Sequence, residues 1–144
     1  MNKILVVEDN PVIGMVIQTV LTDEGHQVEV RKSAMEGLYL MYTGFIPDLV
    51  LTDLIMREMD GRDLIQKMRN DKKLCSIPAV IITASIPNAE NLPDKDQFQG
   101  LLSKPFDLED LVKTVDRLVN HQTLAANNTA LQASTSVAPA PVAV

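Results

Sequence analysis

Short, almost wholly apolar runs constrain the fold of this chain more than any other feature of the sequence. Segments 3–7 (KILVV) and 79–83 (AVIIT) carry one polar residue each. Runs of this length without alternation are typical of strands that are buried on both faces, as in parallel sheets covered by helices. Weaker strand patterns lie at 27–31, 48–52 and 100–103. The sequence therefore predicts five short strands.

Segments with helical patterns alternate with these runs. Asn10 and Pro11 provide an N-cap and a first-turn proline, and apolar residues recur at helical spacing from Val12 to Leu21 before Gly25. Further helices are predicted at 33–44, at 61–71 and from 107 onward, and 88–99 is a polar helical segment interrupted by proline. Five strands alternating with five helical segments predict an α/β fold, a doubly wound parallel sheet with helices on both faces.

Composition limits the classes of protein that remain. The chain has 144 residues and a formal charge of −6, which suits one acidic domain. Its single cysteine, Cys75, excludes an internal disulfide and fits a reducing compartment. No apolar run is long enough to span a bilayer, and neither a basic stripe nor an aromatic platform is present. We expect a cytoplasmic location and neither membrane nor nucleic acid as a partner.

The end of the chain differs in composition from the rest. From His121 to Val144 there is no Lys, Arg, Asp or Glu, and the last residues form an Ala-Pro repeat. We expect a domain over residues 1–120 and a flexible tail rich in Ala, Ser, Thr and Pro over 121–144, with a docking segment or a linker as the alternative. The first strand begins close to Met1, which favours a self-standing protein.

Polar residues stand where the predicted strands end. Glu8 and Asp9 follow the first strand, and Asp53 follows the third. Thr83 is the last residue of the fourth strand, and Lys104 follows the fifth. Ligands of such sheets bind at the carboxyl ends of the strands, so these side chains are expected to converge. Carboxylates held close together raise one another's pKa. The cluster predicts either a hard cation with oxygen ligands, for which Mg²⁺ is suited, or a protonated carboxyl group.

These residues carry a resemblance to a known family. The resemblance rests on Glu8-Asp9, Asp53, Thr83-Ala84 and Lys104-Pro105-Phe106. It rests also on the pattern D-L-x-M-x-x-M-D-G at 53–61. In this order and at these strand ends they resemble the receiver domain of two-component response regulators, of the single-domain type that chemotaxis regulators represent. The resemblance covers residues 2–120 and implies the flavodoxin-like strand order 2-1-3-4-5.

The resemblance also implies a role for each site residue. Asp53 would accept a phosphoryl group from a phosphohistidine of a sensor histidine kinase or a histidine phosphotransfer protein. Thr83 and Lys104 would contact phosphoryl oxygens. The bond before Pro105 would be cis, and Leu101 would occupy the position of the family's aromatic switch residue.

The implied cofactor is Mg²⁺. Asp9 and Asp53 would bind it directly, Glu8 through water, and the backbone carbonyl of Ile55 would complete the protein ligands. The apolar side chain of Ile55 would shield the acyl phosphate from water, so we expect moderate to slow self-dephosphorylation.

The resemblance thus predicts a signalling phosphoacceptor in a two-component or phosphorelay pathway. It would not be an enzyme with an external substrate, although it would catalyse its own phosphorylation and dephosphorylation. Phosphorylation would shift its conformation and so control contacts with a downstream protein target. Arg57, where such receivers usually have proline, and Leu101 favour an alternative, a receiver-like interaction module that is not phosphorylated. A phosphate-cleaving enzyme on a similar sheet is less consistent with the sequence, which lacks a second catalytic base.

Overall fold

The computed structural model describes residues 2–84 and 92–131, with side chains up to residue 120. Strands and helices alternate along the chain as the sequence predicts, except that the described residues form no helix between the last two strands. They are β1 (Lys3–Val7), α1 (Pro11–Asp23), β2 (Gln27–Arg31), α2 (Ala34–Tyr42), β3 (Leu49–Asp53), α3 (Gly61–Arg69), β4 (Ala79–Thr83), β5 (Gly100–Ser103) and α4 (Leu108–Leu131).

All five strands form one parallel sheet in the order β2-β1-β3-β4-β5. The α/β class and the strand order are therefore confirmed. The third strand runs from Leu49 to Asp53, one residue later than predicted, so that Asp53 is its last residue. In the register of the central strands, Val6 of β1 lies beside Leu51 of β3, and Val7 lies beside Thr52. The strands β1 and β3 therefore end next to each other.

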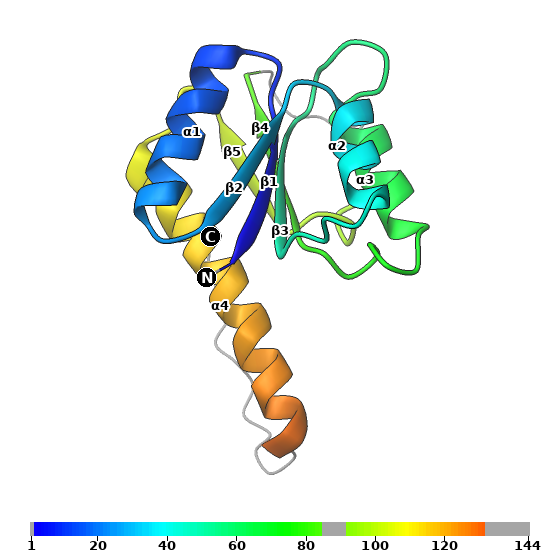
Figure 1. Cartoon of the computed structure of the whole chain (residues 1–144), viewed down its shortest axis with the longest axis vertical. Coiled ribbons are helices and arrows are strands. Elements are labelled where there is room, and N and C mark those ends of the chain that lie inside the picture. The colour runs from blue at the N-terminus through cyan, green and yellow to red at the C-terminus, as the bar shows by residue number, and fades with distance from the viewer. Residues whose placement is uncertain (1, 85–91, 132–144) are drawn as a thin grey trace.

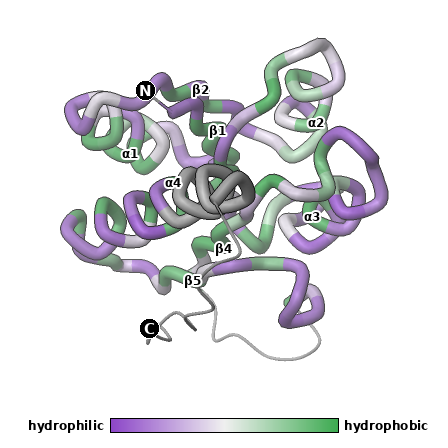
Figure 2. The backbone as a smooth tube through the Cα atoms, turned by 90° about the horizontal axis from the view of Figure 1, so that it is seen from below, coloured by the Kyte–Doolittle hydropathy of each residue, from purple (hydrophilic) through white to green (hydrophobic). Residues whose placement is uncertain are grey.

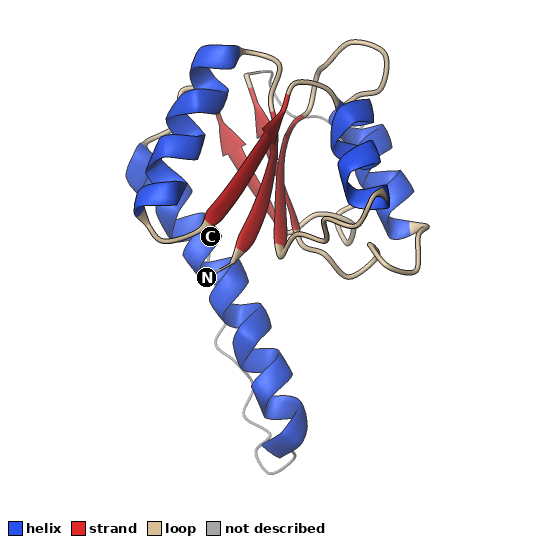
Figure 3. Ribbon diagram, viewed as in Figure 1, coloured by secondary structure: helices blue, strands red, loops and turns tan. Residues whose placement is uncertain are grey.

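Helices cover both faces of the sheet. Figures 1 and 3 show α1 and α4 on one face and α2 and α3 on the other. Figure 2, seen from below, shows the sheet running from β2 to β5 between these layers. Successive residues of β1 serve opposite layers, because side chains alternate along a strand: Ile4 and Val6 pack toward α1 and α4, and Leu5 and Val7 toward α2 and α3. This two-sided burial is why the run carries no polar alternation.

The start of α1 follows from its capping residues. The side-chain oxygen of Asn10 accepts hydrogen bonds from the backbone nitrogens of Val12 and Ile13, at 2.9 and 3.1 Å, and Pro11 occupies the first helical position. At the other end Gly25 has a φ of +95°, in the left-handed region that favours glycine after a helix. Both boundaries of the helix were predicted from these residues.

The segment 88–99 departs from the prediction of a helix. Residues 88–91 lie outside the described residues, and residues 92–99 form turns. Pro93 and the lack of a continuous apolar face explain why no helix forms over these turns. Leu92 and Phe98 instead pack against the small cluster that contains Leu54 and Ile65.

The last helix is longer than expected. We placed a domain boundary after residue 120, but α4 continues to Leu131 and extends away from the sheet in Figure 1. The backbone of 121–131 is thus helical, and the flexible tail over 121–144 stays a prediction. Residues 132–144 lie outside the described residues. No described helix is long and apolar enough to cross a membrane.

On the edge strand β2, side chains donate hydrogen bonds to backbone carbonyl oxygens that face away from the sheet. Gln18 of α1 donates through Nε2 to the carbonyl oxygen of Val28 at 3.3 Å. Arg31 donates through a guanidinium nitrogen to the carbonyl oxygen of Val30 at 2.9 Å and forms an ion pair of 3.2 Å with Glu29. These two carbonyls face away from β1, because Gln27 and Arg31 make the backbone bonds toward the β1 side.

Candidate functional site

Three carboxylates converge where β1 and β3 end. One oxygen from each of Glu8, Asp9 and Asp53 lies within 4.8 Å of the other two. Glu8 and Asp53 are buried, whereas Asp9 is exposed. The convergence follows from the sheet, since neighbouring parallel strands end at the same edge. In Figure 1 this is the upper edge of the molecule.

Lys104 reaches this cluster from the turn after β5. Its ammonium nitrogen lies 2.9 Å from Glu8 Oε1 and 3.3 Å from Asp53 Oδ2. The backbone nitrogen of Lys104 donates to the carbonyl oxygen of Thr83 at 2.8 Å, and the peptide bond to Pro105 is cis, as the resemblance implied. One ammonium group therefore serves two carboxylates at once.

Burial dominates the electrostatics of the two inner carboxyl groups. Desolvation raises the pKa of Glu8, against the opposing effects of Lys104 and of the backbone nitrogen of Asn10, which donates to Glu8 Oε2 at 3.1 Å. Desolvation likewise raises the pKa of Asp53, against the opposing charge of Lys104. Burial alone would lower the pKa of Lys104, but its contacts with Glu8 and Asp53 outweigh burial and raise it.

The backbone of Gly61 lies very close to the backbone of Asp53. A Cβ atom on Gly61 would lie 2.3 Å from the carbonyl oxygen of Asp53, closer than any real contact. The nitrogen of Gly61 donates to the carbonyl oxygen of Leu54 at 2.8 Å. Only glycine fits here, and the start of α3 is thereby held against the end of β3.

Two methionines hold the loop between Asp53 and α3. Met56 and Met59 pack against the core layer under α2 and α3. Ile55, 53% exposed, and Arg57 point to the surface, and Glu58 has a φ of +62°. At the end of the loop, Asp60 Oδ1 accepts a 2.8 Å hydrogen bond from the backbone nitrogen of Asp63 and caps α3.

The remaining predicted residues lie around this cluster. The side chain of Thr83 is fully buried at the end of β4, and Ile55 is in the loop that follows Asp53. Leu101, 37% exposed, lies on the edge strand β5, outside the charged cluster. The structure therefore brings Glu8, Asp9, Asp53 and Lys104 together and leaves Leu101 apart.

Sequence reasoning missed two supporting contacts. The sequence predicts Asn10 as a helix cap, and the structure adds that its backbone nitrogen donates to Glu8 Oε2. Gly61 was read as the start of a helix and as part of a motif, yet it also permits the approach to Asp53. The Asp60-Gly61 pair was a signal for the second contact, because glycine directly after a cap indicates a site without room for a side chain.

The donor set fits a divalent cation of the magnesium type. Three carboxylates converge, and the one ammonium group of Lys104 contacts two of them, so negative charge is in excess. The side chain of Asp9 is exposed. Oxygen ligands in a small, partly open site are those that Mg²⁺ prefers.

The chain matches a family model over residues 4–116, that of the response regulator receiver domain. The chain belongs to this family. Receiver domains are the signalling phosphoacceptors of two-component systems, in which they interact with histidine kinases.

Similar proteins include other receivers and longer regulators. Protein PilH of Pseudomonas aeruginosa is 29% identical over 83% of this chain and 98% of its own length. The "Probable transcriptional regulator ycf29" of Porphyra purpurea is 31% identical over 94% of this chain, but only 65% of that protein is covered. The chain thus spans less than two thirds of the length of such regulators.

Solved structures agree with the receiver fold. Chemotaxis protein CheY4 of Vibrio cholerae superposes with a TM-score of 0.75 at 27% identity, over 82% of this chain and 98% of that one. A response regulator receiver domain protein from Clostridium thermocellum superposes with a TM-score of 0.77 at 26% identity, over 87% of this chain and 99% of that one. The receiver domain of a sensor histidine kinase from Pseudomonas aeruginosa superposes with a TM-score of 0.73 at 23% identity, over 83% of this chain and 98% of that one. That structure was solved with a magnesium ion in its active site cleft.

Proposed function

We propose that Asp53 accepts a phosphoryl group from a phosphohistidine, with Mg²⁺ as the cofactor. The donor would be a sensor histidine kinase or a histidine phosphotransfer protein of the cytoplasm. The observation that carries this proposal is the convergence of Glu8, Asp9 and Asp53 with Lys104 in contact with two of them. Family membership supports it, because receiver domains are phosphoacceptors.

The chemistry requires little more than position and charge. A carboxylate oxygen of Asp53 forms a bond to phosphorus while the bond from phosphorus to the histidine nitrogen breaks, and that nitrogen keeps the electron pair. Negative charge on the transferring oxygens needs cationic partners, and Lys104 is 3.3 Å from Asp53 for this purpose. Thr83, at the end of the neighbouring strand, would donate its hydroxyl group to a phosphoryl oxygen. A bound Mg²⁺, held by Asp9, Asp53 and the carbonyl of Ile55, and by Glu8 through water, would neutralise the remaining charge.

The same site would control the signal and its lifetime. Phosphorylation would replace the single negative charge of Asp53 by a group that carries about −1.5 to −2, and this group would attract Lys104 away from Glu8. That displacement would change contacts with a downstream protein target. Water attack on the acyl phosphate would end the signal, and Ile55 on the accessible side would slow that attack.

The experiment uses the full chain with Mg²⁺ and a histidine phosphotransfer protein labelled at its phosphohistidine. We expect an acid-stable, base-labile label on the wild type and on the control Asp94→Asn, an exposed residue outside the cluster. Asp53→Asn should lose the label. Equal labelling of Asp53→Asn and wild type would contradict the proposal.

A second candidate is an interaction module that is not phosphorylated. Two observations favour it, the aliphatic Leu101 and the turns over 92–99 where a helix was expected. The two candidates differ in how beryllofluoride, a phosphoryl mimic, affects partner capture by the full chain. Capture that changes with the mimic in the wild type but not in Asp53→Asn supports the phosphoacceptor. Equal capture under both conditions supports the module.

A further inference from the structure

The outward side of α2 carries three large exposed side chains, which we call the α2 patch. They are Met35, Tyr39 and Tyr42, which are 54%, 71% and 59% exposed. Their spacing of four and three residues places them on one side of the helix, each next to the following one. Tyr39 and Tyr42 are the only tyrosines of the chain, which has no tryptophan. Neighbouring exposed apolar residues, unlike single scattered ones, indicate an interaction site.

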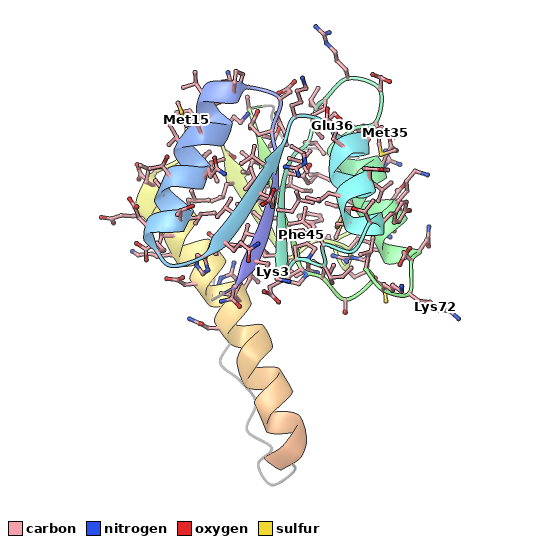
Figure 4. All side chains as sticks on the ribbon, in the orientation of Figure 1. Lys3, Met15, Met35, Glu36, Phe45 and Lys72 are labelled. Atoms are coloured by element: carbon pink, nitrogen blue, oxygen red, sulfur yellow. The ribbon has the colours of Figure 1, made fainter. Side chains whose placement is uncertain are left out.

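Two surface hollows flank the α2 patch. The hollow on the side of β2 has a volume of about 430 Å³, and Met35, Tyr39 and Leu40 are part of its lining. The hollow on the side of α3 has a volume of about 540 Å³, and Met35 and Met59 are part of its lining. Figure 4 labels Met35 near the upper end of α2. A ridge between two hollows is a shape that another helix can pack against, because the side-chain ridges of one helix fit the grooves of the next.

Acidic side chains border both hollows. Glu36 lines the hollow toward β2, and Glu58 and Asp63 line the hollow toward α3. Within residues 2–84 and 92–120, neither Glu36 nor Glu58 forms an ion pair. The linings also contain the bases Arg31 and Lys67, but Arg31 is already paired with a glutamate of β2 at 3.2 Å. Negative charge is therefore in excess at the sides of the α2 patch and attracts a cationic partner.

The neighbouring bases Lys32 and Arg57 do not cancel this excess beside the tyrosines. They line a third hollow, which extends toward the carboxylate cluster through Asp9, and neither tyrosine is part of its lining. The acidic border and the aromatic side chains of the α2 patch thus remain together on the outward side of α2.

The charge separates the possible occupants of the α2 patch. A second copy of the chain would bring the same acids to a symmetric contact, in which like charges would face each other. A membrane with anionic lipids would be repelled by the same acids. A helix with an apolar side and flanking lysines or arginines, in contrast, complements both the apolar ridge and its acidic border.

We propose that the α2 patch is a docking site for a basic amphipathic helix of a partner protein. The apolar side of that helix packs on Met35, Tyr39 and Tyr42, and its basic residues face Glu36 and the acids on the side of α3. Tyrosine and methionine are residues that the centres of protein interfaces favour. The inference goes beyond the proposed phosphorylation and does not depend on it.

The experiment uses the full chain, without Mg²⁺ or a phosphoryl donor, and two synthetic peptides. The first peptide has about 18 residues, with leucines along one side of the helix, lysines on both flanks of that side, and neither tyrosine nor tryptophan. The second peptide has glutamates in place of the lysines. Affinity is measured from the anisotropy of a fluorescent label on the peptide. Intrinsic tyrosine emission locates the contact, because both tyrosines belong to the α2 patch.

We expect the lysine peptide to bind about tenfold more tightly than the glutamate peptide at low salt, with a smaller difference at high salt. Tyr39→Ala should weaken binding of the lysine peptide about tenfold, as for a central aromatic residue of an interface, and Met35→Ala about threefold. Met15→Ala is the matched control, since Met15 is a methionine of 59% exposure on α1, on the other side of the sheet (Figure 4).

A second pair of variants tests the charge. Glu36→Gln should weaken binding of the lysine peptide about twofold, as for an exposed charge contact, whereas Glu109→Gln, an exposed change at the start of α4, should leave it unchanged. All five positions are exposed, so urea unfolding should be the same in all variants and a loss of affinity reports a lost contact.

Three results would overturn the inference. They are equal binding of the two peptides, binding without a change in tyrosine emission, and a loss in Met15→Ala as large as that in Met35→Ala. Self-association of the chain that Tyr39→Ala abolishes would overturn it in favour of a second copy. Tighter binding to phosphatidylserine vesicles than to the lysine peptide would overturn it in favour of a membrane. Each of these results leaves the labelling of Asp53, and with it the proposed function, untouched.

Discussion

For the two buried residues of the carboxylate cluster, burial and charge have opposite effects on stability. Glu8 and Asp53 lie in the interior because the strands that carry them are buried, and burial penalises their ionised forms. Lys104 offsets part of this cost for both. The protein thus maintains an acidic site at some expense of stability, as expected where charge serves function.

The pKa shifts predict how stability depends on pH. The pKa values of Glu8 and Asp53 are raised in the folded state, so the folded chain binds protons more readily than the unfolded chain there. Their contribution favours folding below the ordinary carboxyl pKa and is lost as the pH rises through the raised values. Urea unfolding without Mg²⁺ should therefore show Asp53→Asn gaining stability relative to wild type at neutral pH. The gain should shrink as the pH falls toward the acid range, and a gain independent of pH would contradict this account.

Gly61 gives a second prediction for a single residue. Gly61→Ala places a Cβ against the carbonyl oxygen of Asp53, so the backbone must shift at Asp53. We expect a loss of about 1–3 kcal/mol in the free energy of unfolding, as for overpacking in an interior, together with weaker Mg²⁺ binding. Gly14→Ala is the control, because its Cβ would meet side chains and no backbone atom: a methyl carbon of Val30 at 3.2 Å, and Cβ and Cγ of Glu8 at 4.0 Å. Equal losses in the two variants would argue against a special role for Gly61.

Single elements follow local signals where those signals are strong. The buried runs of β1 and β4 and the capped helix α1 could be predicted from periodicity and capping residues alone. The turns over 92–99 could not be assigned, because their few apolar residues reach the core without a helical period. The continuation of α4 to Leu131 was missed because the change in composition was taken for a stop. Yet 121–131 contains neither glycine nor proline and is rich in alanine, so nothing local ends the helix.

The N-cap of α1 gives a prediction at this scale. Asn10→Ala removes the acceptor for the backbone nitrogens of Val12 and Ile13 and should cost about 1 kcal/mol of stability. The backbone contact from residue 10 to Glu8 would remain, so Mg²⁺ affinity should change little. Thr22→Ala, an exposed change in the same helix, should stay within about 0.5 kcal/mol in urea unfolding. A loss in Thr22→Ala as large as that in Asn10→Ala would contradict the capping argument.

The whole molecule combines a core of two layers with one polar edge. The sheet supplies apolar side chains to both layers and, at its upper edge, ends in the carboxylates. The residues of that edge could be predicted because strand ends of a parallel sheet converge. The ion pairs between these residues could not be predicted, because the position of the Lys104 ammonium group depends on the conformation of the turn after β5.

Cation binding should therefore be linked to global stability. A ligand that binds only the folded chain raises the free energy of unfolding by about 2.7 kcal/mol at one hundred times its dissociation constant. We expect Mg²⁺ to stabilise the wild type in this way and to have far less effect on Asp9→Asn, which keeps the buried cluster but loses its accessible ligand. Thermal unfolding with and without Mg²⁺ measures the difference. Equal stabilisation of both proteins would place the cation elsewhere.

The side-chain cover on β2 bears on how the molecule behaves in a crowded solution. An open strand edge is a template on which another chain can add a strand, and growth of that kind leads to fibres or swapped dimers. Gln18 and Arg31 occupy the acceptors of Val28 and Val30 that an incoming strand would need. Encounters at this edge are therefore expected to end without backbone pairing, and any assembly through this edge would have to be selected by side chains.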